Sequence, residues 1–564
     1  MERVRQRIAE QRERSRAHAD CNVWIRPLEE SELEPYLDGL ERSGPEGRGL
    51  FGRSFAIKDN IDLAGVPTTA GCPEYAYLPE RHATVVERLI AAGAIPLGKT
   101  NLDQFATGLV GVRSPYGAVP NAIAPDRIAG GSSSGSAVAV ALGLADFALG
   151  TDTAGSGRVP AAFNELVGVK PTRGWLSTRG VVPACRTLDC VSIFARSVGE
   201  AWSALEAAAG HDPLDAHARP YRATGFSPQE PVVGHADPGE LDFFGDAAYA
   251  AAYEAALERV SEAGVDLRVI DVRPFLSAAE LLYEGPWIAE RYAALGEFLR
   301  ANPRDVHPVT LEILSAGAGV SAAEAFRAQY RLAELKLEAD AVLEGVDCAV
   351  LPTAGTLPTL AAVAAEPVAL NARLGRYTNF MNLLDLAAVA VPAARARDGR
   401  PSGVTLFGPA GSDFSLLALA ARLTGEEAPA GAPPGFVELA VCGAHMRGMP
   451  LNGQLTGAGA FLLQRTRTAR GYRLYALPDG PPERPALVRD AESEAAIELE
   501  VWAAPESSVG PFLEGVPAPL GLGKLELADG RWVTGFIAEP RARDGARDIT
   551  DFGGWRAYRA GRTG

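Results

Sequence analysis

Most of the chain alternates short apolar runs with alanine-rich runs, and this alternation constrains the fold more than any other feature. The apolar runs at 54–57, 94–97, 349–351 and 388–391 have strand character, whereas the run at 83–92 has helical spacing. Strands and helices that alternate over several hundred residues are typical of an α/β architecture. We therefore expect a mixed β-sheet covered by helices.

A single segment reads as a linker. Residues 424–435 (TGEEAPAGAPPG) combine proline, glycine and alanine without apolar periodicity, as flexible connections do. The chain of 564 residues is therefore expected to hold a large domain at 1–423 and a small domain at 436–564.

The small domain has a different pattern, in which apolar and polar residues alternate. This alternation predicts half-buried strands at 497–501, 524–527 and 532–537, with a turn at Asp529-Gly530 between the last two. The small domain is therefore expected to be α+β.

The charge balance excludes some partners. The chain has 54 basic and 70 acidic residues and a formal net charge of −16, whereas nucleic acids and anionic membranes attract positive surfaces. The longest uncharged apolar stretch, 137–145, is far shorter than the roughly 20 residues that cross a bilayer. We expect no nucleic acid and no membrane, and an anionic substrate would need a local cation.

Cysteine usage and the N-terminus indicate a cytoplasmic protein. The six cysteines form no CxxC pair, so neither a zinc site nor a disulfide framework is indicated. The first twenty residues mix acids with arginines and lack the apolar region of a signal peptide. They are expected to form a solvated helix.

Polar residues with chemical potential gather between residues 58 and 173. Lys58-Asp59-Asn60 follows an apolar strand, and two loops rich in glycine and serine lie at 130–136 (GGSSSGS) and 150–158 (GTDTAGSGR). A phosphate-binding loop is not indicated, because GxxxxGK[ST] is absent. A Ser-His-Asp hydrolase is disfavoured too, because none of the seven histidines lies in a Gly-x-Ser-x-Gly elbow or an HExxH pattern.

Taken together, these segments resemble the amidase signature hydrolases. The match is carried by 58–60 (KDN), 98–106 (GKTNLDQFA), 130–136, 151–156 (TDTAGS) and 168–172 (GVKPT). The resemblance implies an amidase signature fold without a metal or cofactor. It also implies a Ser-cisSer-Lys triad of Lys58, Ser132 and Ser156 with a cis peptide before Ser132, and it makes Ser133, Ser134 and Ser136 loop or helix-cap residues.

The chemistry of such a triad follows from general principles. A serine hydroxyl needs a base, and a lysine acts as a base only when a desolvated setting keeps it neutral. Ser132 between Lys58 and Ser156 would accept a proton from Ser156 and donate its own to Lys58. The N–H groups of Thr153, Ala154, Gly155 and Ser156 would face the developing oxyanion.

Two neighbours of the second loop are expected to have structural roles. Asp152 is interpreted as a residue that shapes the loop rather than as a triad acid. Arg158 is expected to pair with Asp152 or with nearby carbonyl groups.

Three further segments look like the allophanate hydrolase branch of this family. They are the nucleophile segment Ala154-Gly155-Ser156-Gly157-Arg158, residues 103–117, and 441–452 (VCGAHMRGMPLN) in the small domain. The resemblance implies that the substrate is allophanate, a small planar anion, and that Tyr283 and Arg291 in the segment 283–291 hold it. It also implies a homodimer and a functional link to a separate urea carboxylase.

In that branch the small domain resembles the gamma-glutamylcyclotransferase-like fold and is associated with decarboxylation of the first product. His445 is the one histidine of this domain and is a candidate acid or cation there.

Other interpretations remain open from the residues alone. The chain could be a general amidase or the A-type component of an amidotransferase, with the small domain a dimerisation or docking module without catalysis. Tyr283 could be an aromatic core residue, Arg291 a solvated arginine on a helix surface, and His445 a structural loop residue.

Overall fold

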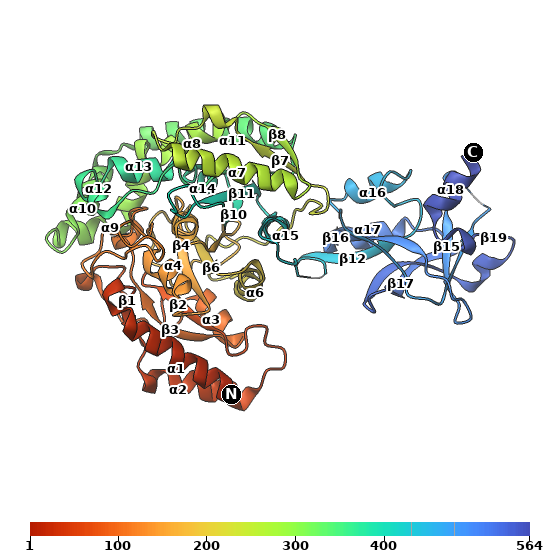
Figure 1. Ribbon diagram of the computed structural model, residues 1–564, viewed down its shortest axis with the longest axis horizontal. Coiled ribbons are helices and arrows are strands. Elements are labelled where there is room, and N and C mark those ends of the chain that lie inside the picture. Colours follow the sequence, from red (N-terminus) through yellow and green to blue (C-terminus); the bar gives the residue numbers. More distant parts are fainter. Residues whose placement is uncertain (430, 479, 564) are drawn as a thin grey trace. The chain divides into compact units, whose positions relative to one another are not determined.

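The computed structural model describes residues 1–429, 431–478 and 480–563, apart from the side chains of residues 283, 284 and 563. The chain forms two compact units (Figure 1). The first unit contains Met1–Tyr221 and Val232–Ala428, and the second contains Arg222–Pro231 and Pro429–Gly564. The main part of the second unit begins inside the expected linker, but the sequence gives no sign that 222–231 belongs to this unit.

The first unit is built on a mixed sheet of eleven strands. In spatial order the strands are β1 (Trp24–Pro27), β3 (Ile95–Thr100), β2 (Ser54–Lys58), β4 (Phe147–Asp152), β6 (Cys190–Ala195), β5 (Val167–Lys170), β10 (Leu386–Pro392), β11 (Gly403–Pro409), β9 (Cys348–Pro352), β7 (Val232–His235) and β8 (Asp266–Val269). β2 pairs in parallel with β3 and β4, and β7 does so with β8 and β9, whereas the other neighbours are antiparallel.

Helices surround this sheet. They are α1 (Glu2–Ala17), α2 (Glu30–Ser43), α3 (Thr84–Ala91), α4 (Ser134–Ala141), α5 (Val159–Phe163), α6 (Val198–Ala208), α7 (Ala247–Glu262), α8 (Arg273–Glu284), α9 (Trp287–Ala301), α10 (Pro308–Ser315), α11 (Ala322–Leu343), α12 (Leu360–Ala365), α13 (Ala369–Gly375), α14 (Phe380–Leu383) and α15 (Asp413–Thr424). The expected α/β architecture with a mixed sheet is confirmed.

The strands predicted from apolar runs lie in the middle of the sheet and are buried on both faces. Every residue of β2, β3 and β4 is buried, and α4 packs against all three strands. A run without polar alternation is what a strand covered on both faces requires. The carboxyl ends of β2 and β4, which are parallel neighbours, bring Lys58 and Asp152 to the same edge.

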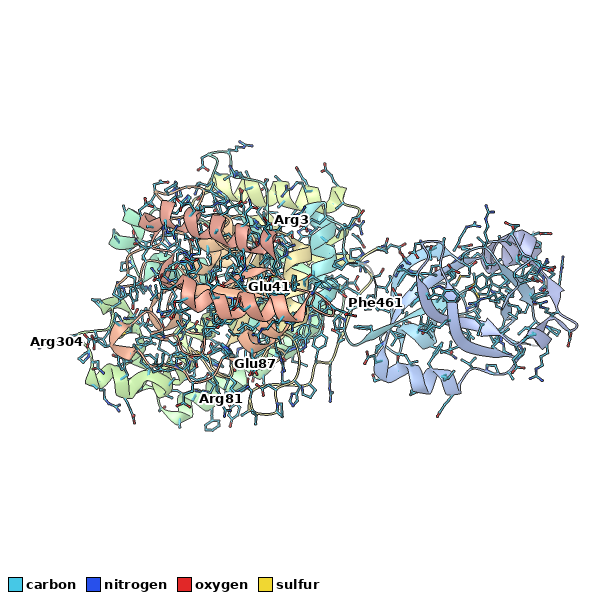
Figure 2. The ribbon with its side chains drawn as sticks, turned by 90° about the horizontal axis from the view of Figure 1, so that it is seen from below. Arg3, Glu41, Arg81, Glu87, Arg304 and Phe461 are labelled. Carbon is cyan, nitrogen blue, oxygen red and sulfur yellow. The ribbon has the colours of Figure 1, made fainter. Side chains whose placement is uncertain are left out.

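Two helix predictions can be compared directly with the structure. The charged N-terminus forms α1, in which only Ile8 and Gln11 are buried, and Arg3 points outward (Figure 2). The small-residue helix expected to run to residue 145 instead ends at Ala141, because Gly143 has a φ of +66°.

The second unit contains two smaller sheets. The larger has the order β13 (Phe461–Arg467), β16 (Glu498–Pro505), β12 (Phe436–Val441), β18 (Trp532–Ala538) and β17 (Leu520–Glu526), and the smaller has the order β15 (Pro485–Arg489), β14 (Tyr472–Ala476) and β19 (Arg547–Asp548). The helices are α16 (Asn452–Thr456), α17 (Glu506–Glu514) and α18 (Trp555–Thr563). The expected α+β composition is confirmed.

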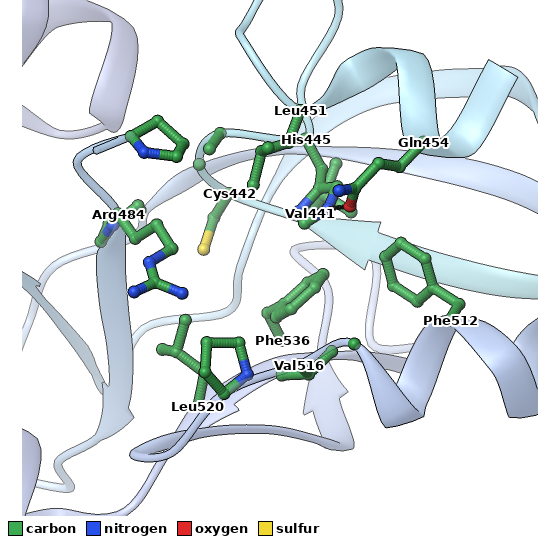
Figure 3. Close-up of a pocket in the computed structure, with 16 residues that line it drawn as sticks. Val441, Cys442, His445, Leu451, Gln454, Arg484, Phe512, Val516, Leu520 and Phe536 are labelled. Atoms are coloured by element: carbon green, nitrogen blue, oxygen red, sulfur yellow. Dashed lines mark hydrogen bonds between the residues drawn. The ribbon is translucent and has the colours of Figure 1, made fainter. Parts of the chain in front are cut away.

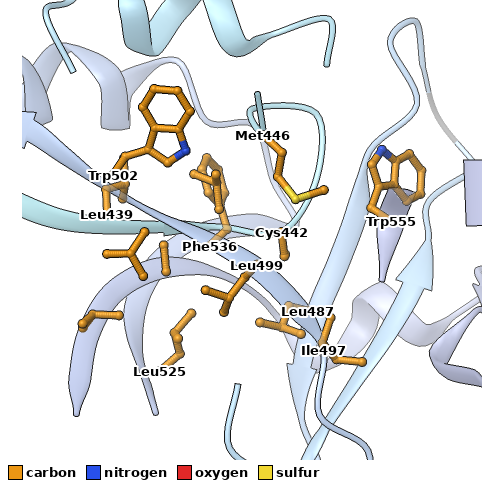
Figure 4. Packing of buried hydrophobic residues seen from close by; sticks show 14 of the residues in the cluster. Leu439, Cys442, Met446, Leu487, Ile497, Leu499, Trp502, Leu525, Phe536 and Trp555 are labelled. Carbon is orange, nitrogen blue, oxygen red and sulfur yellow. The ribbon is translucent and has the colours of Figure 1, made fainter. Parts of the chain in front are cut away.

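The core of this unit corrects one expectation. Leu499 and Trp502 of β16 pack with Trp555 in one apolar cluster (Figure 4). Glu500, expected on a solvated face, is only 1% exposed. Its carboxylate accepts the Arg447 N–H at 2.7 Å and pairs with Arg556 at 2.6 Å. β16 is therefore buried on both faces rather than half-buried, because these partners satisfy the acidic side chain.

The segment 222–231 packs inside the second unit. A Cβ on Gly225 would lie 2.1 Å from the ring of Phe461 (Figure 2), so glycine allows the close approach. Ala223 packs against the small cluster of Phe436, Phe461 and Ala503, and Glu230 forms an ion pair with Arg447.

Across the described residues, no single helix is long and apolar enough to cross a membrane. Only the consecutive segments Pro308–Gly319 and Ala322–Leu343, bent by 98°, meet the length and composition requirement when taken together.

Candidate active site

Lys58 ends strand β2 inside the first unit and has no exposed surface. Its Nζ is hydrogen-bonded to Ser132 Oγ at 2.7 Å and to Thr151 Oγ1 at 2.8 Å. Burial lowers the pKa of Lys58 from 10.5 to about 7, because removal from water disfavours the charged amine. Asp103, Asp152 and Asp189 act in the opposite direction. The neutral amine is therefore well populated near pH 7.

Ser132 lies in a loop that is shaped by its glycines and by Asp103. The Gly131–Ser132 peptide bond is cis, as the family resemblance implies. The N–H of Asp103 donates to Ser132 O at 3.0 Å, and the Asp103 carboxylate accepts the N–H of Gly111 at 2.9 Å. A Cβ on Gly131 would lie 2.1 Å from Asp103 Oδ2. Position 131 therefore requires glycine for this packing.

The other loop serines stabilise the first turn of α4. Ser133 precedes the helix and donates to Thr151 O at 3.1 Å. Ser136 lies inside α4 and donates to Leu149 O at 2.9 Å. Neither hydroxyl is hydrogen-bonded to Lys58 in the described structure, in line with the structural role expected for them.

Thr151 is a site residue that sequence reasoning did not single out. Its Oγ1 is hydrogen-bonded to Lys58 Nζ and accepts the Asn60 Nδ2–H at 3.2 Å. Thr151 belongs to β4, the parallel neighbour of β2. The available signal was a polar residue near the carboxyl end of a neighbouring strand, but the strand order was needed to use it.

Asp152 organises the loop that carries Ser156. Its carboxylate accepts the N–H of Gly155 at 2.8 Å and of Gly157 at 3.0 Å. It also pairs with Arg158 at 2.9 Å, and neither side chain of this pair is exposed. The prediction that Asp152 shapes the loop is confirmed. Arg158 also donates to Thr378 O at 3.1 Å, so both of its expected kinds of partner are present.

A second segment of the chain, around α14, supports the same loop. Thr378 Oγ1 donates to Ala154 O at 2.7 Å, and Asn382 Nδ2 donates to Asp152 O at 2.8 Å. Gly155 has a φ of +130°, and a Cβ there would lie 2.3 Å from Thr378 Oγ1. Both the backbone conformation and the available space therefore require glycine at position 155.

Ser156 follows this glycine and is 4% exposed. Within the described part of the chain its hydroxyl has no hydrogen-bond partner, so no hydrogen bond joins it to Ser132. The N–H groups of Thr153, Ala154 and Ser156 likewise lack partners there, whereas that of Gly155 is bound to Asp152. The four expected oxyanion donors are therefore reduced to three in this structure.

Arg291 lies on α9 and is only 1% exposed. Its Nη1 donates to Thr107 Oγ1 at 3.3 Å. Its positive charge adds to the effect of burial in lowering the pKa of Lys58. The alternative of a solvated arginine is wrong, because α9 faces the protein interior here. Tyr283 lies in α8, and its side chain is outside the described part of the structure.

His445 belongs to the second unit and follows β12. Its Nε2 is hydrogen-bonded to Gln454 Oε1 at 2.9 Å, and its ring stacks on Phe536 with 5.1 Å between ring centroids. Burial lowers the pKa of His445. The residue lines a pocket of about 230 Å³ (Figure 3). In the ranges described, no cluster of three His, Cys, Asp or Glu side chains is suited to a metal ion.

Comparison with known proteins agrees with this division into units. The amidase family model matches residues 8–417, and the model of the allophanate hydrolase C-terminal domain matches residues 437–560. The solved allophanate hydrolase of Kluyveromyces lactis is 40% identical with a TM-score of 0.79, over 96% of this chain and 93% of that chain.

Two kinds of curated relatives share parts of this pattern. Urea amidolyase of Saccharomyces cerevisiae is 42% identical over 95% of this chain, which spans only 31% of that protein's length. The A-type component of the glutamyl-tRNA(Gln) amidotransferase of Natronomonas pharaonis is 33% identical over 69% of this chain and 97% of the relative. The chain therefore belongs to the amidase family, in the branch that carries an allophanate hydrolase C-terminal domain.

Proposed function

We propose that this amidohydrolase cleaves allophanate with Lys58, Ser132 and Ser156 and releases ammonia. The product, N-carboxycarbamate, then loses carbon dioxide, so that ammonia and carbon dioxide are the net products. The observation that carries the proposal is the 2.7 Å contact between the buried Lys58 amine and Ser132 Oγ. The pathway is urea or s-triazine nitrogen catabolism.

The first step uses a proton relay. Neutral Lys58 takes the Ser132 proton while Ser132 takes that of Ser156, and Ser156 Oγ forms a bond to the terminal amide carbon of allophanate. The oxyanion accepts hydrogen bonds from the N–H groups of Thr153, Ala154 and Ser156. The C–N bond then breaks, the relay returns a proton to the departing nitrogen, and water releases the acyl group by the same route.

The substrate carboxylate requires a cation in a protein with a net charge of −16. We assign this role to Arg291, whose guanidinium can form paired hydrogen bonds with a carboxylate, and a hydrogen bond to Tyr283. Burial of Arg291 close enough to influence the pKa of Lys58 supports the assignment.

We place the decarboxylation step in the pocket of the second unit, with His445 as the acid. A homodimer in the cytoplasm and a functional link to a separate urea carboxylase complete the proposal. The link follows from the chemistry, because allophanate is urea that carries a carboxylate on one nitrogen. The six free thiols are consistent with a reducing compartment.

The test is an ammonia-release assay of the purified chain with allophanate, acetamide, malonamide and biuret. We expect a clear preference for allophanate in kcat/KM. Equal rates on the neutral amides would instead favour a general amidase, and ammonia release from glutamine only with partner proteins would favour an amidotransferase. The similarity to a solved allophanate hydrolase over 96% of the chain favours the first outcome.

A further inference from the structure

The pocket in the second unit has an apolar wall and a polar wall (Figure 3). The apolar wall is formed mainly by Phe512, Val516, Leu520 and Phe536, whereas His445, Gln454 and Arg484 supply polar side chains. Among the lining residues that the structure describes, Arg484 is the only one with a permanent charge. A small anion in this pocket would therefore meet one fixed cation.

Arg484 immediately precedes β15, and its carbonyl accepts the Leu477 N–H at 3.1 Å, which closes the turn from β14. Its guanidinium is directed into the pocket (Figure 3). The Nε atom is buried and has no hydrogen-bond partner in the described residues. By contrast, Arg473 of the neighbouring strand pairs with Asp490 at 2.9 Å. Because a buried donor without an acceptor is unfavourable, a ligand that supplies one would be stabilised here.

The backbone keeps Arg484 and His445 on the same pocket. A Cβ on Gly443 would lie 2.4 Å from Cγ and Cδ of Pro485. Glycine therefore lets the loop after β12 pack directly against the start of β15. Asn452 Nδ2 donates to His445 O at 2.9 Å and supports the loop from the other side.

His445 presents one ring nitrogen for chemistry. Because Gln454 Oε1 can only accept a hydrogen bond, Nε2 carries a hydrogen, and the neutral ring has its lone pair on Nδ1. Burial lowers the pKa of His445, so this residue is neutral in the empty pocket near pH 7. A permanent positive charge must come from another residue.

We propose that Arg484 is the carboxylate-binding residue of this pocket and holds one end of the dianion N-carboxycarbamate beside His445. This inference rests on the proposed function, which supplies the dianion as the first product. The guanidinium fork matches a carboxylate through two parallel hydrogen bonds. The bound dianion then favours protonation of His445.

The step balances without any further reactant. One C–N bond of N-carboxycarbamate breaks, its electron pair stays on nitrogen, nitrogen takes one proton from protonated His445, and carbon dioxide leaves. The carbamate that remains paired with Arg484 takes a second proton and separates into ammonia and carbon dioxide. Arg484 acts by holding the retained carboxylate in place.

Malonate provides a direct test, because a methylene group replaces the nitrogen and the molecule does not decarboxylate under these conditions. The full chain is labelled with ¹³C-histidine, the His445 signal is identified with His445→Asn, and malonate is titrated. In the wild type we expect the signal to shift and the pKa of His445 to rise. Arg484→Gln should weaken this malonate binding at least tenfold, and Arg484→Lys should weaken it less.

The matched control is Arg470→Gln, which removes an exposed arginine paired with Glu494 at 2.8 Å in the same unit and should leave malonate binding unchanged. Melting temperatures verify that each variant is folded. No response of the His445 signal in the wild type, or equal affinity in folded Arg484→Gln, overturns the proposal.

A second measurement follows turnover of ¹³C-allophanate. Arg484→Gln should lower the rate of carbon dioxide release relative to the first ammonia, so that the signal of N-carboxycarbamate accumulates. A wild type that releases no ammonia from allophanate contradicts the proposed function itself. The malonate titration still decides the role of Arg484 in that case.

Discussion

Thr151 Oγ1 lies 2.8 Å from Lys58 Nζ on a neighbouring parallel strand, and Asn60 Nδ2 donates to the same oxygen at 3.2 Å. A neutral amine has two N–H groups and one lone pair. When one N–H points at Thr151, the lone pair can face Ser132. Thr151 is therefore a positioning residue for the proposed base.

Thr151→Val should lower kcat/KM by about 10- to 100-fold, the effect of a lost hydrogen bond to a charged group. The acid limb of the pH profile should also move to lower pH, because the ammonium form loses an acceptor. Thr151→Ser keeps the hydroxyl and should retain most activity. Wild-type kinetics in Thr151→Val would remove Thr151 from the site.

Ser156→Ala should abolish amide hydrolysis in a folded protein, with a loss of at least about a thousandfold. Lys58→Ala should be similarly inactive, and the double variant should be no worse than either single variant, because members of a relay act as a unit. Ammonia release and circular dichroism check both points. Losses that multiply in the double variant would contradict a shared relay.

The pKa of Lys58, lowered to about 7, predicts an acid limb in kcat/KM. Above pH 7 the amine is mostly neutral and able to accept the Ser132 proton. Below pH 7 it is protonated, and the rate should fall about tenfold for each pH unit. A flat profile between pH 5 and 7, in protein shown to remain folded, would argue against Lys58 as the base.

Arg291→Lys should impair allophanate turnover although the charge is conserved, because the paired geometry is lost. Loss of one partner of a desolvated charge pair costs about 2–5 kcal/mol, so we expect kcat/KM for allophanate to fall by tens to thousands of fold and that for malonamide to fall less. Arg300→Lys, on the exposed face of the same helix, is the control. Equal losses on both substrates would assign Arg291 to folding.

Gly155→Ala should displace the loop that carries Ser156. Alanine at a φ of +130° and 2.3 Å from Thr378 Oγ1 should lower the free energy of unfolding by about 1–3 kcal/mol and reduce turnover. Gly199→Ala is the control, because no atom lies within 4 Å of the new Cβ and alanine favours helices. Calorimetry compares both variants, and a wild-type melting temperature and rate for Gly155→Ala would contradict the expectation.

The sequence was informative where a local pattern determines the structure. The apolar runs became buried central strands, and the spacing of Asp152 and Arg158 was sufficient to predict a structured loop. The role of Thr151 could not be predicted, because it depends on which strand lies beside β2. The same holds for Glu500, which alternation places on a solvated face but which Arg447 and Arg556 bind in the interior.

Long-range placement was beyond local patterns. Arg484 and His445 are far apart in sequence and line one pocket only because β15 packs against Gly443. Arg291 looks like any charged helical residue in the sequence, and only the packing of α9 buries it.

The membership of 222–231 in the second unit has a genetic consequence. Because this segment lies between β6 and β7 in the chain order, no single cut separates the two units into intact pieces. A fragment that starts at residue 429 leaves behind Ala223, which packs against Phe436 and Phe461, and Glu230, the partner of Arg447. Recombination that exchanges the second unit as one contiguous block would leave its new host with an incomplete surface. The two units are therefore inherited most readily together.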